Sequence, residues 1–485
     1  MSTYPVLPRE TTIASLPPLH PASPNAQDRI TTLLTSTNPR RLVVLDDDPT
    51  GTQTCHDISV LTVWDIPTIR TELLTNSLGF FILTNSRALP PSQAETLIRE
   101  ICNNVAEAAK ETGHEGHVDI ALRGDSTLRG HFPLEVDVAS SVFGIPDAVI
   151  LAPFFFQGGR FTIDDVHYVV EGDSLVPAGS TQFAKDATFG YKSSNLRDYV
   201  LEKAGGRIGA DQTHSITLGD IRVGGADGVR QRLLSFPRGE GGVIIVNAAA
   251  EEDMAVFVEG LLRAEATPNP SRYIYRTGAA FVSTRLGIAG IPPLTATDLA
   301  LPTPRQTGGL LLAGSYVPKT TEQLKVLTDA RSPEHLSVIE MSVQELIASS
   351  ESAAALIARV IEKTEANLQN GMDTLVMTSR DLVVGGDELS SLAIGSRVAG
   401  ALVGVLEGIE VRPRFVIAKG GITSSDAATK GLRMKRALIV GQAAAGVPLW
   451  RCDEPTSRHR GVPFVVFPGN VGGESTLCDL VAAWS

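Results

Sequence analysis

The chain has 485 residues, well past the length at which a single hydrophobic core stops growing, so we expect two domains. Hydrophobic residues make up 43% and charged residues 20% of the sequence, as in an ordinary globular protein. Lys plus Arg number 42 and Asp plus Glu number 54, and the net charge of −12 argues against nucleic acid or an anionic membrane as a partner. The composition is compatible with assembly into a homo-oligomer.

Three chain-wide features concern compartment and processing. No two cysteines have the spacing of a zinc site or a redox motif, so we expect a reducing, cytoplasmic compartment and no disulfide framework among Cys55, Cys102, Cys452 and Cys478. No apolar run reaches membrane-spanning length. Residues 1–40 contain seven prolines and many Ser and Thr residues, which predicts a flexible tail.

Short apolar runs alternate with helical patterns between residues 41 and 290. In the stretch Gln93–Thr112, for example, Leu97, Ile101 and Val105 recur at helical spacing. The predicted strands are Arg41–Leu45, Ile58–Val63, Phe80–Thr84, Asp119–Leu122 and Ala148–Ala152. This alternation predicts a parallel sheet flanked by helices, and we assign residues 41–290 to a first α/β domain.

A proline-rich stretch follows this region. Residues 291–308 show no clear periodicity, and they predict a linker. From residue 309 the alternation restarts, with helices predicted at Val343–Ala366 and Leu389–Leu406 and strands at Gly309–Ala313, Thr374–Thr378, Phe415–Ala418, Ala437–Val440 and Phe464–Phe467. Residues 309–485 therefore form a second predicted α/β domain. We expect each domain to have a largely parallel sheet flanked by helices, with the active site in the cleft between the domains.

Three consecutive aspartates, Asp46, Asp47 and Asp48, follow the first predicted strand. Adjacent carboxylates repel one another unless a cation, a hydrogen-bond donor or a substrate hydroxyl offsets the repulsion. In open α/β sheets, ligands bind beyond the carboxyl ends of the strands. We therefore predict that this loop, with Thr50 and Gly51, belongs to the site; the alternative is a solvated acidic turn.

A second polar turn, RGDSTLRGH at residues 123–131, follows the strand at Asp119–Leu122. Arg123 and Arg129 have the planar donors that hold a carboxylate, and Ser126 can bind a hydroxyl group. In the alternative interpretation Asp125 or Ser126 caps a helix and the arginines lie at the surface.

A third segment, Pro153–Arg160, follows the strand at Ala148–Ala152. Its two glycines allow close approach of the backbone, and Arg160 is a further candidate anion contact. His167 follows, but a lone histidine is more often structural than catalytic.

Glycine-containing turns follow three predicted strands of the second domain. The clearest, KGGITSSD at residues 419–426, joins a strand to a helical pattern, a combination that presents unpaired backbone N–H groups to an anion. No GxxxxGK[ST] sequence occurs, so this is not a P-loop. We predict contacts with a phosphate-rich ligand from Ser315, Gly420, Gly421, Ile422, Thr423, Gly469 and Asn470.

The acidic loop also satisfies a phosphatase pattern. Asp46-x-Asp48-x-Thr50 matches the DxDx[TV] motif of haloacid-dehalogenase-like sugar phosphatases, in which the first aspartate attacks phosphorus. That interpretation requires a downstream lysine and an acidic pair, for which Lys185 and Asp164–Asp165 are available. It leaves the glycine turns of the second domain without a role. A non-catalytic metabolite sensor that reuses the arginines is a third interpretation.

Taken together, the motifs resemble the four-carbon acid sugar kinase family. The family's DDxTG loop, DSTLRG turn and proline-to-GGR segment are matched by residues 47–51, 125–130 and 153–160. Its GS turn, GGxT loop and late SGN-type loop correspond to residues 314–315, 420–423 and 469–470. The resemblance spans residues 41–480. It departs at Pro468, where a basic residue is usual, and at the additional Asp46, and it does not place the segment Thr181–Asn195.

The resemblance implies an ATP-dependent kinase that phosphorylates a terminal hydroxyl of a tetronate or 3-oxo-tetronate, with Mg²⁺ as an expected cofactor. The first domain would bind this small-molecule acid sugar and the second would bind ATP. Asp47 and Asp48 are the implied catalytic residues, and the sequence leaves open which is the base and which the Mg²⁺ ligand. The implied substrate contacts are Asp46, Thr50, Gly51, Arg123, Asp125, Ser126, Arg129 and Arg160.

Overall fold

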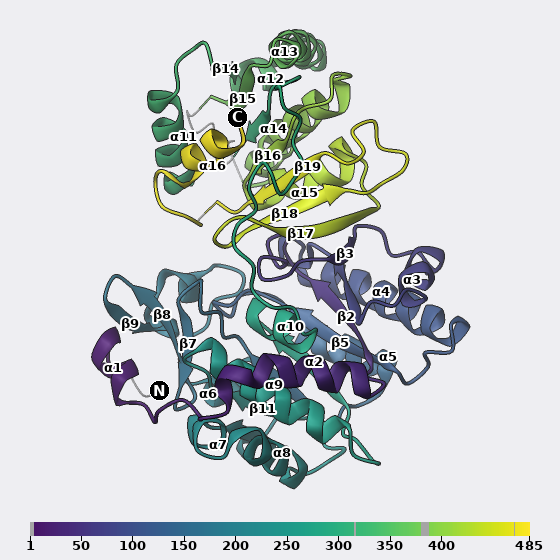
Figure 1. Cartoon of the computed structure of the whole chain (residues 1–485), viewed down its shortest axis with the longest axis vertical. Coiled ribbons are helices and arrows are strands. Elements are labelled where there is room, and N and C mark those ends of the chain that lie inside the picture. The colour runs from purple at the N-terminus through teal and green to yellow at the C-terminus, as the bar shows by residue number, and fades with distance from the viewer. Residues whose placement is uncertain (1–3, 315–316, 380–387, 470) are drawn as a thin grey trace. The chain divides into compact units, whose positions relative to one another are not determined.

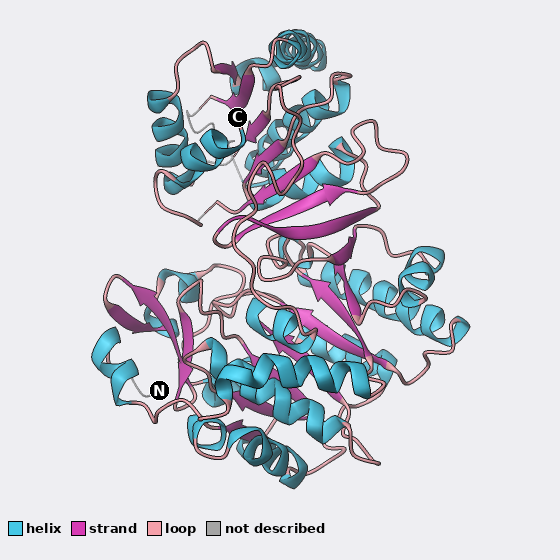
Figure 2. Ribbon diagram, in the orientation of Figure 1, coloured by secondary structure: helices cyan, strands magenta, loops and turns pink. Residues whose placement is uncertain are grey.

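The computed structural model describes residues 4–314, 317–379, 388–469 and 471–485. The contacts within the chain divide it into two compact units (Figure 1). The first comprises Met1–Thr54 and Val63–Gly290, and the second comprises Cys55–Thr62 and Ile291–Ser485. Each unit is an α/β fold with helices packed against its sheet, as the alternation of apolar and amphipathic segments predicts (Figure 2).

The main sheet of the first unit has the strand order β10-β11-β6-β12-β5-β2-β4, and every neighbouring pair is parallel. Continuous burial along these strands is typical of a parallel sheet covered on both faces. The strands are β2 (Arg41–Asp46), β4 (Gly79–Leu83), β5 (Val118–Arg123), β6 (Ala148–Ala152), β10 (Thr213–Ile216), β11 (Gly242–Val246) and β12 (Tyr273–Thr277).

The register of this sheet places several strand ends side by side. Asp46 at the end of β2 pairs with Arg123 at the end of β5, and Arg123 pairs with Thr277 at the end of β12. Thr277 in turn pairs with Ala152 of β6, and Asp46 pairs with Leu83 of β4. The loops that follow these strands therefore meet at one edge of the sheet.

Helices and a small antiparallel sheet complete the first unit. The small sheet has the order β1-β9-β8-β7, with β1 (Leu7–Pro8), β7 (Arg160–Ile163), β8 (Val166–Glu171) and β9 (Ser174–Pro177). The helices are α1 (Arg9–Ser15), α2 (Ala26–Ser36), α3 (Ile66–Leu73), α4 (Pro91–Glu111), α5 (Leu134–Phe143), α6 (Leu196–Ala204), α7 (Leu218–Arg222), α8 (Gly225–Ser235), α9 (Glu251–Glu265) and α10 (Ala279–Arg285). The helix predicted at Gln93–Thr112 is confirmed as α4.

The N-terminal segment is not the flexible tail that its proline content predicts. β1 pairs with β9, and α2 packs against α9 with Ala26, Ile30 and Leu34 buried (Figure 1). Arg29 of α2 donates hydrogen bonds to the Glu259 carboxylate at 2.7 and 2.8 Å. The apolar residues recur at every fourth position and form a buried stripe, a signal that the surrounding prolines obscured.

The sheet of the second unit has the order β3-β17-β18-β19-β16-β13-β15-β14. The strands from β19 to β14 are parallel, whereas β3, β17 and β18 add antiparallel pairs. They are β3 (Ile58–Leu61), β13 (Leu310–Ala313), β14 (Leu336–Met341), β15 (Asp373–Thr378), β16 (Val416–Lys419), β17 (Arg436–Ala444), β18 (Val447–Cys452) and β19 (Pro463–Phe467).

Three details of the second unit differ from the sequence-based expectation. β3, predicted within the first domain, pairs with β17, because a buried strand does not encode which sheet it joins. The long helix predicted at Val343–Ala366 is two helices, separated where Ser349 caps the second by accepting a hydrogen bond from Ser352 N. The expected linker packs on the core of this unit, with Leu294 N donating to Gln442 O at 2.8 Å.

The helices of the second unit lie on both faces of its sheet (Figure 2). They are α11 (Pro318–Ala330), α12 (Val343–Ala348), α13 (Ser350–Gln369), α14 (Glu388–Gly408), α15 (Gly421–Asp426) and α16 (Thr476–Trp484). Across the described ranges of the whole chain, no helix combines the length and the apolar character needed to cross a membrane. The four cysteines are free.

Candidate active site

The acidic loop begins inside β2 and turns at Gly51. Asp46 is fully buried and Asp47 is 4% exposed, and neither carboxylate has a hydrogen-bond partner among the described residues. A Cβ atom at Gly51 would overlap the Asp46 carboxylate, so this position requires glycine. Gly51 N donates to Asp48 O at 3.0 Å and closes the turn.

The three adjacent carboxylates have different environments. Burial raises the pKa of Asp46 well above its ordinary value, and burial raises the pKa of Asp47 to about 6. Burial acts in the same direction on Asp48, but Arg87 and the hydrogen bonds from Thr50 outweigh it and lower the Asp48 pKa. At neutral pH Asp47 and Asp48 are therefore ionised, and burial favours the neutral form of Asp46 more than Arg123 opposes it.

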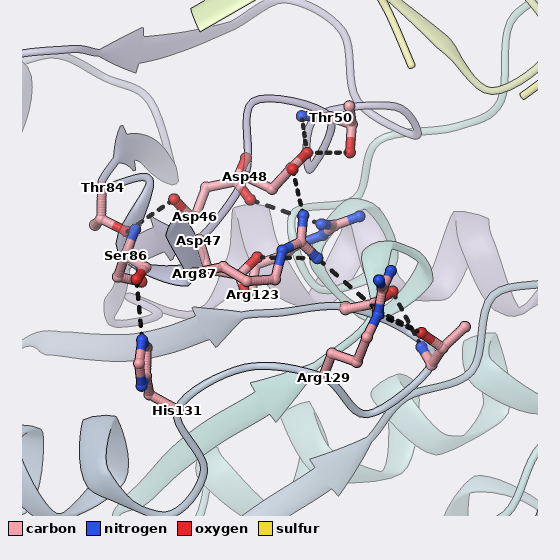
Figure 3. A network of polar contacts seen from close by, with 12 residues as sticks. Asp46, Asp47, Asp48, Thr50, Thr84, Ser86, Arg87, Arg123, Arg129 and His131 are labelled. Carbon is pink, nitrogen blue, oxygen red and sulfur yellow. Dashed lines mark hydrogen bonds and ion pairs between the residues drawn. The ribbon is translucent and has the colours of Figure 1, made fainter. Parts of the chain in front are cut away.

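Arg87 joins the acidic loop to the second polar turn. It lies after β4, in the short 3-10 helix Ser86–Ala88. Its guanidinium forms an ion pair with Asp48 and lies 3.8 Å from Asp47 and 4.0 Å from Asp125 (Figure 3). Arg87 was not predicted, because no motif surrounds it in the sequence; the parallel pairing of β4 with β2 brings it to the site.

The backbone that carries Arg87 is held by buried hydrogen bonds. Thr84 donates to Asp46 O from its amide at 2.9 Å and from its hydroxyl at 3.0 Å. His131 Nε2 donates to Ser86 O at 3.0 Å (Figure 3). These contacts hold the backbone from which the Arg87 side chain extends.

The polar turn after β5 is held through its carbonyl groups. Four successive carbonyl oxygens accept hydrogen bonds from four different buried side chains. The pairs are His167 Nε2 with Ser126 O (2.7 Å), Tyr191 Oη with Thr127 O (2.7 Å), Tyr199 Oη with Leu128 O (3.0 Å) and Arg276 Nη2 with Arg129 O (3.2 Å). In a planar trans peptide unit the N–H points opposite to the C=O. The N–H groups of Arg129 and Gly130 therefore point away from these side chains, and such N–H groups can donate to an anion.

Asp125 binds within its own turn. Its carboxylate accepts from Thr127 N at 3.1 Å and from Arg129 Nε at 2.6 Å. Burial alone would raise the Asp125 pKa, but Arg87 and Arg129 outweigh it and lower that pKa. Asp125 therefore closes its own turn and caps no helix, contrary to the alternative interpretation, since the next helix, α5, begins at Leu134 with Pro133 at its N-cap. The arginines do not lie at the surface either, because the side chains of Arg123 and Arg129 are only 3% and 30% exposed.

Two further arginines, Arg123 and Arg276, lie beside the polar turn. Arg123 Nη1 is 3.7 Å from Asp46 Oδ1, so Arg123 faces the buried acid. Arg276 fills the space beside Gly124 and Gly130, where a Cβ on Gly124 would overlap its guanidinium. Arg276 was not predicted, because the strand that carries it, β12, was not predicted; its pairing with β5 places it here.

Arg160 lies at the start of β7 and is the third arginine predicted from the sequence. Its Nη1 donates to Gly158 O, and its guanidinium carbon lies 5.7 Å from the ring centre of Phe183. The guanidinium carbon of Arg129 lies 5.2 Å from the same ring. The structure therefore brings Arg160 together with the polar turn.

The predicted nucleotide contacts lie at neighbouring strand ends of the second unit. β16 lies between β13 and β19, so Gly420 lies between the turns at Gly314 and Gly469. A Cβ atom on Gly314 would lie 3.3 Å from Thr423 Oγ1, so those two turns touch. Gly420 has a φ of 109°, a conformation open almost only to glycine.

The remaining predicted contacts have different positions. Gly421 and Ile422 open α15, and Ile422 is 68% exposed, whereas Thr423 is buried. Ser315 and Asn470 lie outside the residues that the structure describes.

The loop that follows β19, with Pro468, Gly469 and residues 471–473, is the late glycine loop. Its carbonyl groups accept hydrogen bonds from side chains, as those of the polar turn in the first unit do. Burial and the nearby Lys319 lower the pKa of Lys419 to about 7, and its Nζ lies 4.0 Å from the centre of the Phe467 ring. Neither lysine was predicted as a contact of this loop. The hydrogen bonds join Lys419 Nζ to Pro468 O (2.6 Å), Lys319 Nζ to Gly472 O (3.3 Å) and Gln323 Nε2 to Val471 O (3.1 Å) and Gly473 O (2.8 Å).

Removing the Tyr199 hydroxyl is expected to loosen the polar turn. Tyr199→Phe leaves the buried Leu128 carbonyl without its hydrogen bond, which costs about 1–2 kcal/mol of folding free energy. Thermal unfolding measures the loss. Tyr168→Phe is the matched control, since the buried Tyr168 makes no hydrogen bond through its hydroxyl within the described residues, and equal effects of the two changes would contradict the prediction.

The comparisons with known proteins agree with this two-part arrangement. Residues 42–285 match the sugar-binding N-terminal domain family, and residues 310–477 match the nucleotide-binding C-terminal domain family. A D-erythronate kinase of Heliobacterium modesticaldum (strain ATCC 51547 / Ice1) is 26% identical over 258 residues, which cover 52% of this chain and 50% of that protein. The chain thus spans about half the length of this curated relative.

Two solved structures share the fold. A Salmonella typhimurium LT2 protein has a TM-score of 0.63 and 15% identity, with 90% of this chain and 98% of that one covered. The Haemophilus influenzae protein HI1011 has a TM-score of 0.58 and 16% identity, with 91% and 100% covered. Both domain matches together account for most of the sequence, and the chain belongs to the four-carbon acid sugar kinase family.

Proposed function

We propose that the chain transfers the γ-phosphoryl group of ATP to a terminal hydroxyl of a four-carbon acid sugar of the tetronate or 3-oxo-tetronate type. The observation that carries the proposal is Asp47, a buried carboxylate without a hydrogen-bond partner among the described residues, beside Arg87 and the polar turn. The similarity to a D-erythronate kinase supports the class of acceptor.

Asp47 is the proposed general base. A pKa of about 6 leaves it ionised at neutral pH and still basic enough to accept a proton. The acceptor hydroxyl oxygen attacks the γ-phosphorus, its proton passes to Asp47, and ADP leaves with the electron pair of the broken P–O bond. Asp48 is less suited to this role, because Thr50 and Arg87 engage its two oxygens; it positions Arg87.

Charge at the edge of the first sheet supports an anionic acceptor. Five arginines lie around the acidic loop and the polar turn, and one of them, Arg160, has no carboxylate within 4.0 Å among the described residues. Guanidinium groups attract an acid and stabilise the charge on a transferring phosphoryl group. The arginines are Arg87, Arg123, Arg129, Arg160 and Arg276.

The second unit is the proposed ATP site, with phosphate contacts from the turns at Gly420 and Gly469. Mg²⁺ bound with ATP would neutralise phosphate charge, and the chain would contribute one or two carboxylates to hold it. No group of three or more His, Cys, Asp or Glu side chains in the described parts of the chain is arranged to hold a metal ion. Both Asp47 carboxylate oxygens are buried and lack a hydrogen-bond partner among the described residues, so Asp47 is the carboxylate that would serve as Mg²⁺ ligand if it does not serve as the base.

The phosphatase alternative has less support. Its nucleophile would be Asp46, which is fully buried and whose raised pKa favours the neutral, non-nucleophilic form. Its acidic pair is engaged elsewhere, since Asp165 accepts hydrogen bonds from Ser215 and Asn247.

An ATP-consumption screen across four-carbon acid sugars tests the proposal, with ADP and the position of the product phosphate both measured. We expect ATP-dependent phosphorylation of at least one such acid at its terminal hydroxyl. Hydrolysis of phosphorylated sugars without ATP would instead establish the phosphatase. Tight binding of an acid with neither activity would establish a sensor.

Lys419→Met is expected to weaken nucleotide binding. The methionine cannot donate to the Pro468 carbonyl, so the late glycine loop loses an anchor, and the KM for ATP rises about tenfold, as a lost charged hydrogen bond predicts. The KM for the acid sugar stays near that of the wild type. Lys325→Met, which removes an exposed lysine paired with Asp329, is the control. An unchanged KM for ATP would remove Lys419 from the site.

A further inference from the structure

The segment Thr181–Asn195, which the family resemblance does not place, packs against the polar turn of the first unit. Tyr191 donates to the Thr127 carbonyl at 2.7 Å, and the Phe189 ring meets His131 edge-on with 4.9 Å between ring centres. Asp186 lies 3.9 Å from Arg129 Nη1. The segment is therefore part of the wall around the turn.

Phe183 is the residue of this segment whose ring lies beside two arginines, Arg129 and Arg160. Their guanidinium carbons lie 5.2 and 5.7 Å from the centre of its ring. An aromatic face attracts a guanidinium and offers it a flat surface. Two like charges would otherwise separate, so the shared ring offsets part of their repulsion.

The two arginines differ in how their charge is balanced. Arg129 is paired with Asp125 through Nε at 2.6 Å. Arg160 donates to the Gly158 carbonyl, and no carboxylate of the described residues lies within 4.0 Å of it; its Nε has no hydrogen-bond partner there. Arg160 is thus a largely desolvated cation next to a second cation, and among the described residues Asp125 attracts it only from beyond ion-pair distance.

A cavity of about 510 Å³ opens at this place. Arg160 and Phe183 line it together with Thr181, Gln182 and Glu171. Arg129 connects this region with the acidic loop: Asp125, which lies 4.0 Å from Arg87, holds Arg129, and Arg129 shares the Phe183 ring with Arg160.

We propose that Phe183 is a specificity-determining residue, which holds Arg160 beside Arg129 so that the pair binds the carboxylate end of the acceptor. The proposal rests on the proposed function and adds the groups that distinguish an acid from a neutral polyol. Arg160 supplies the charge that the carboxylate neutralises, and its planar donors bind two oxygens at once. Arg123, a candidate for the same role from sequence, instead faces Asp46.

Binding to the full-length chain, measured by calorimetry without ATP, tests the proposal with two probes, D-erythronate and the neutral polyol erythritol. Phe183→Leu and Arg160→Gln are each expected to weaken D-erythronate binding at least tenfold and to leave erythritol binding unchanged. In steady state the KM for the acid rises by the same factor, while kcat changes less than threefold. Phe183→Tyr keeps the ring and restores binding to within threefold of the wild type.

Phe156→Leu is the matched control, because Phe156 is 41% exposed, packs edge-on against Phe161 and contacts neither arginine. Wild-type affinity for D-erythronate in both Phe183→Leu and Arg160→Gln would overturn the proposal, as would a wild-type protein that binds no four-carbon acid. Binding that is lost in the variants supports the proposal even where the wild type consumes no ATP, an outcome in which only the proposed function fails. Turnover of the acid with an unchanged KM in both variants sinks the proposal and leaves the function standing.

Discussion

Replacing Asp47 with asparagine is expected to lower kcat by about 10²–10⁴-fold, the usual contribution of a positioned general base. The amide of Asn has no basic oxygen for the hydroxyl proton, while its size and shape stay close to those of aspartate. In the wild type, kcat/KM is expected to fall about tenfold per pH unit below about pH 6, where Asp47 becomes protonated. Steady-state rates of the wild type and the variant from pH 4.5 to 8 measure both effects.

The same substitution is expected to stabilise the first unit at neutral pH. Burial raises the folded-state pKa of Asp47 from 3.8 to about 6. Protonated Asp47 therefore favours the folded state below pH 3.8, and this contribution to the free energy of unfolding is lost as the pH rises through 6. A shift of this size corresponds to roughly 3 kcal/mol, which the neutral asparagine recovers above pH 6. Scanning calorimetry should show a higher Tm for Asp47→Asn at pH 7.5, with a gain that shrinks as pH falls from 6 towards 4.

Asp173→Asn is the matched control, since Asp173 lies exposed between β8 and β9. It should change neither kcat nor Tm. A fully active Asp47→Asn variant would remove Asp47 from the role of base. A lower Tm at pH 7.5 would mean that attraction by Arg87 and Arg276 exceeds the effect of burial on this carboxylate.

Arg87→Met is expected to produce the largest loss of stability. The substitution leaves Asp48 without its ion pair, and it takes the shared cation away from Asp47 and Asp125. Removing one partner of a buried pair costs about 3–5 kcal/mol, because the other charge stays buried. It also raises the pKa of Asp48, because Arg87 is the strongest of the contacts that lower it.

Calorimetry and steady-state kinetics measure the effect, with kcat expected to fall together with Tm. Arg87→Lys keeps the charge but loses the planar fork, so it should give an intermediate result. Arg99→Met is the matched control, because Arg99 is 44% exposed and pairs with Glu95 within one helix, a contact worth about 0.5 kcal/mol or less. Equal effects of the changes at Arg87 and Arg99 would show that Arg87 does not organise the site.

Local sequence was enough to place the polar turns at strand ends. The strand before Asp46 is a continuous apolar run, and such a run followed by charged residues marks both the strand and its end. The glycines at 420 and 421 likewise mark the turn between a strand and a helix, because backbone conformation at a turn depends mainly on the local residues. The two α/β units and the turns at residues 46–51, 123–131 and 420–423 could therefore be predicted.

The partners of those turns could not be predicted, because contacts between distant residues depend on strand order. Arg87 and Arg276 reach the acidic loop through the pairing of β4 and β12 with their neighbours, and a buried apolar strand carries no signal of its partner. The same limit hid the pairing of β3 with β17.

The sequence by itself determined that Asp46, Asp47 and Asp48 stand together at the end of a strand, and only the tertiary structure decided what each carboxylate does. Identical side chains have identical intrinsic pKa values, and their differences arise from burial and from nearby charges. Here the fold turns Asp46 inward beside Arg123, leaves Asp47 without a hydrogen-bond partner in the described residues, and ties Asp48 to Arg87 and Thr50. The proposed proton acceptor differs from its two chemically equal neighbours because burial and charge are properties of the folded chain.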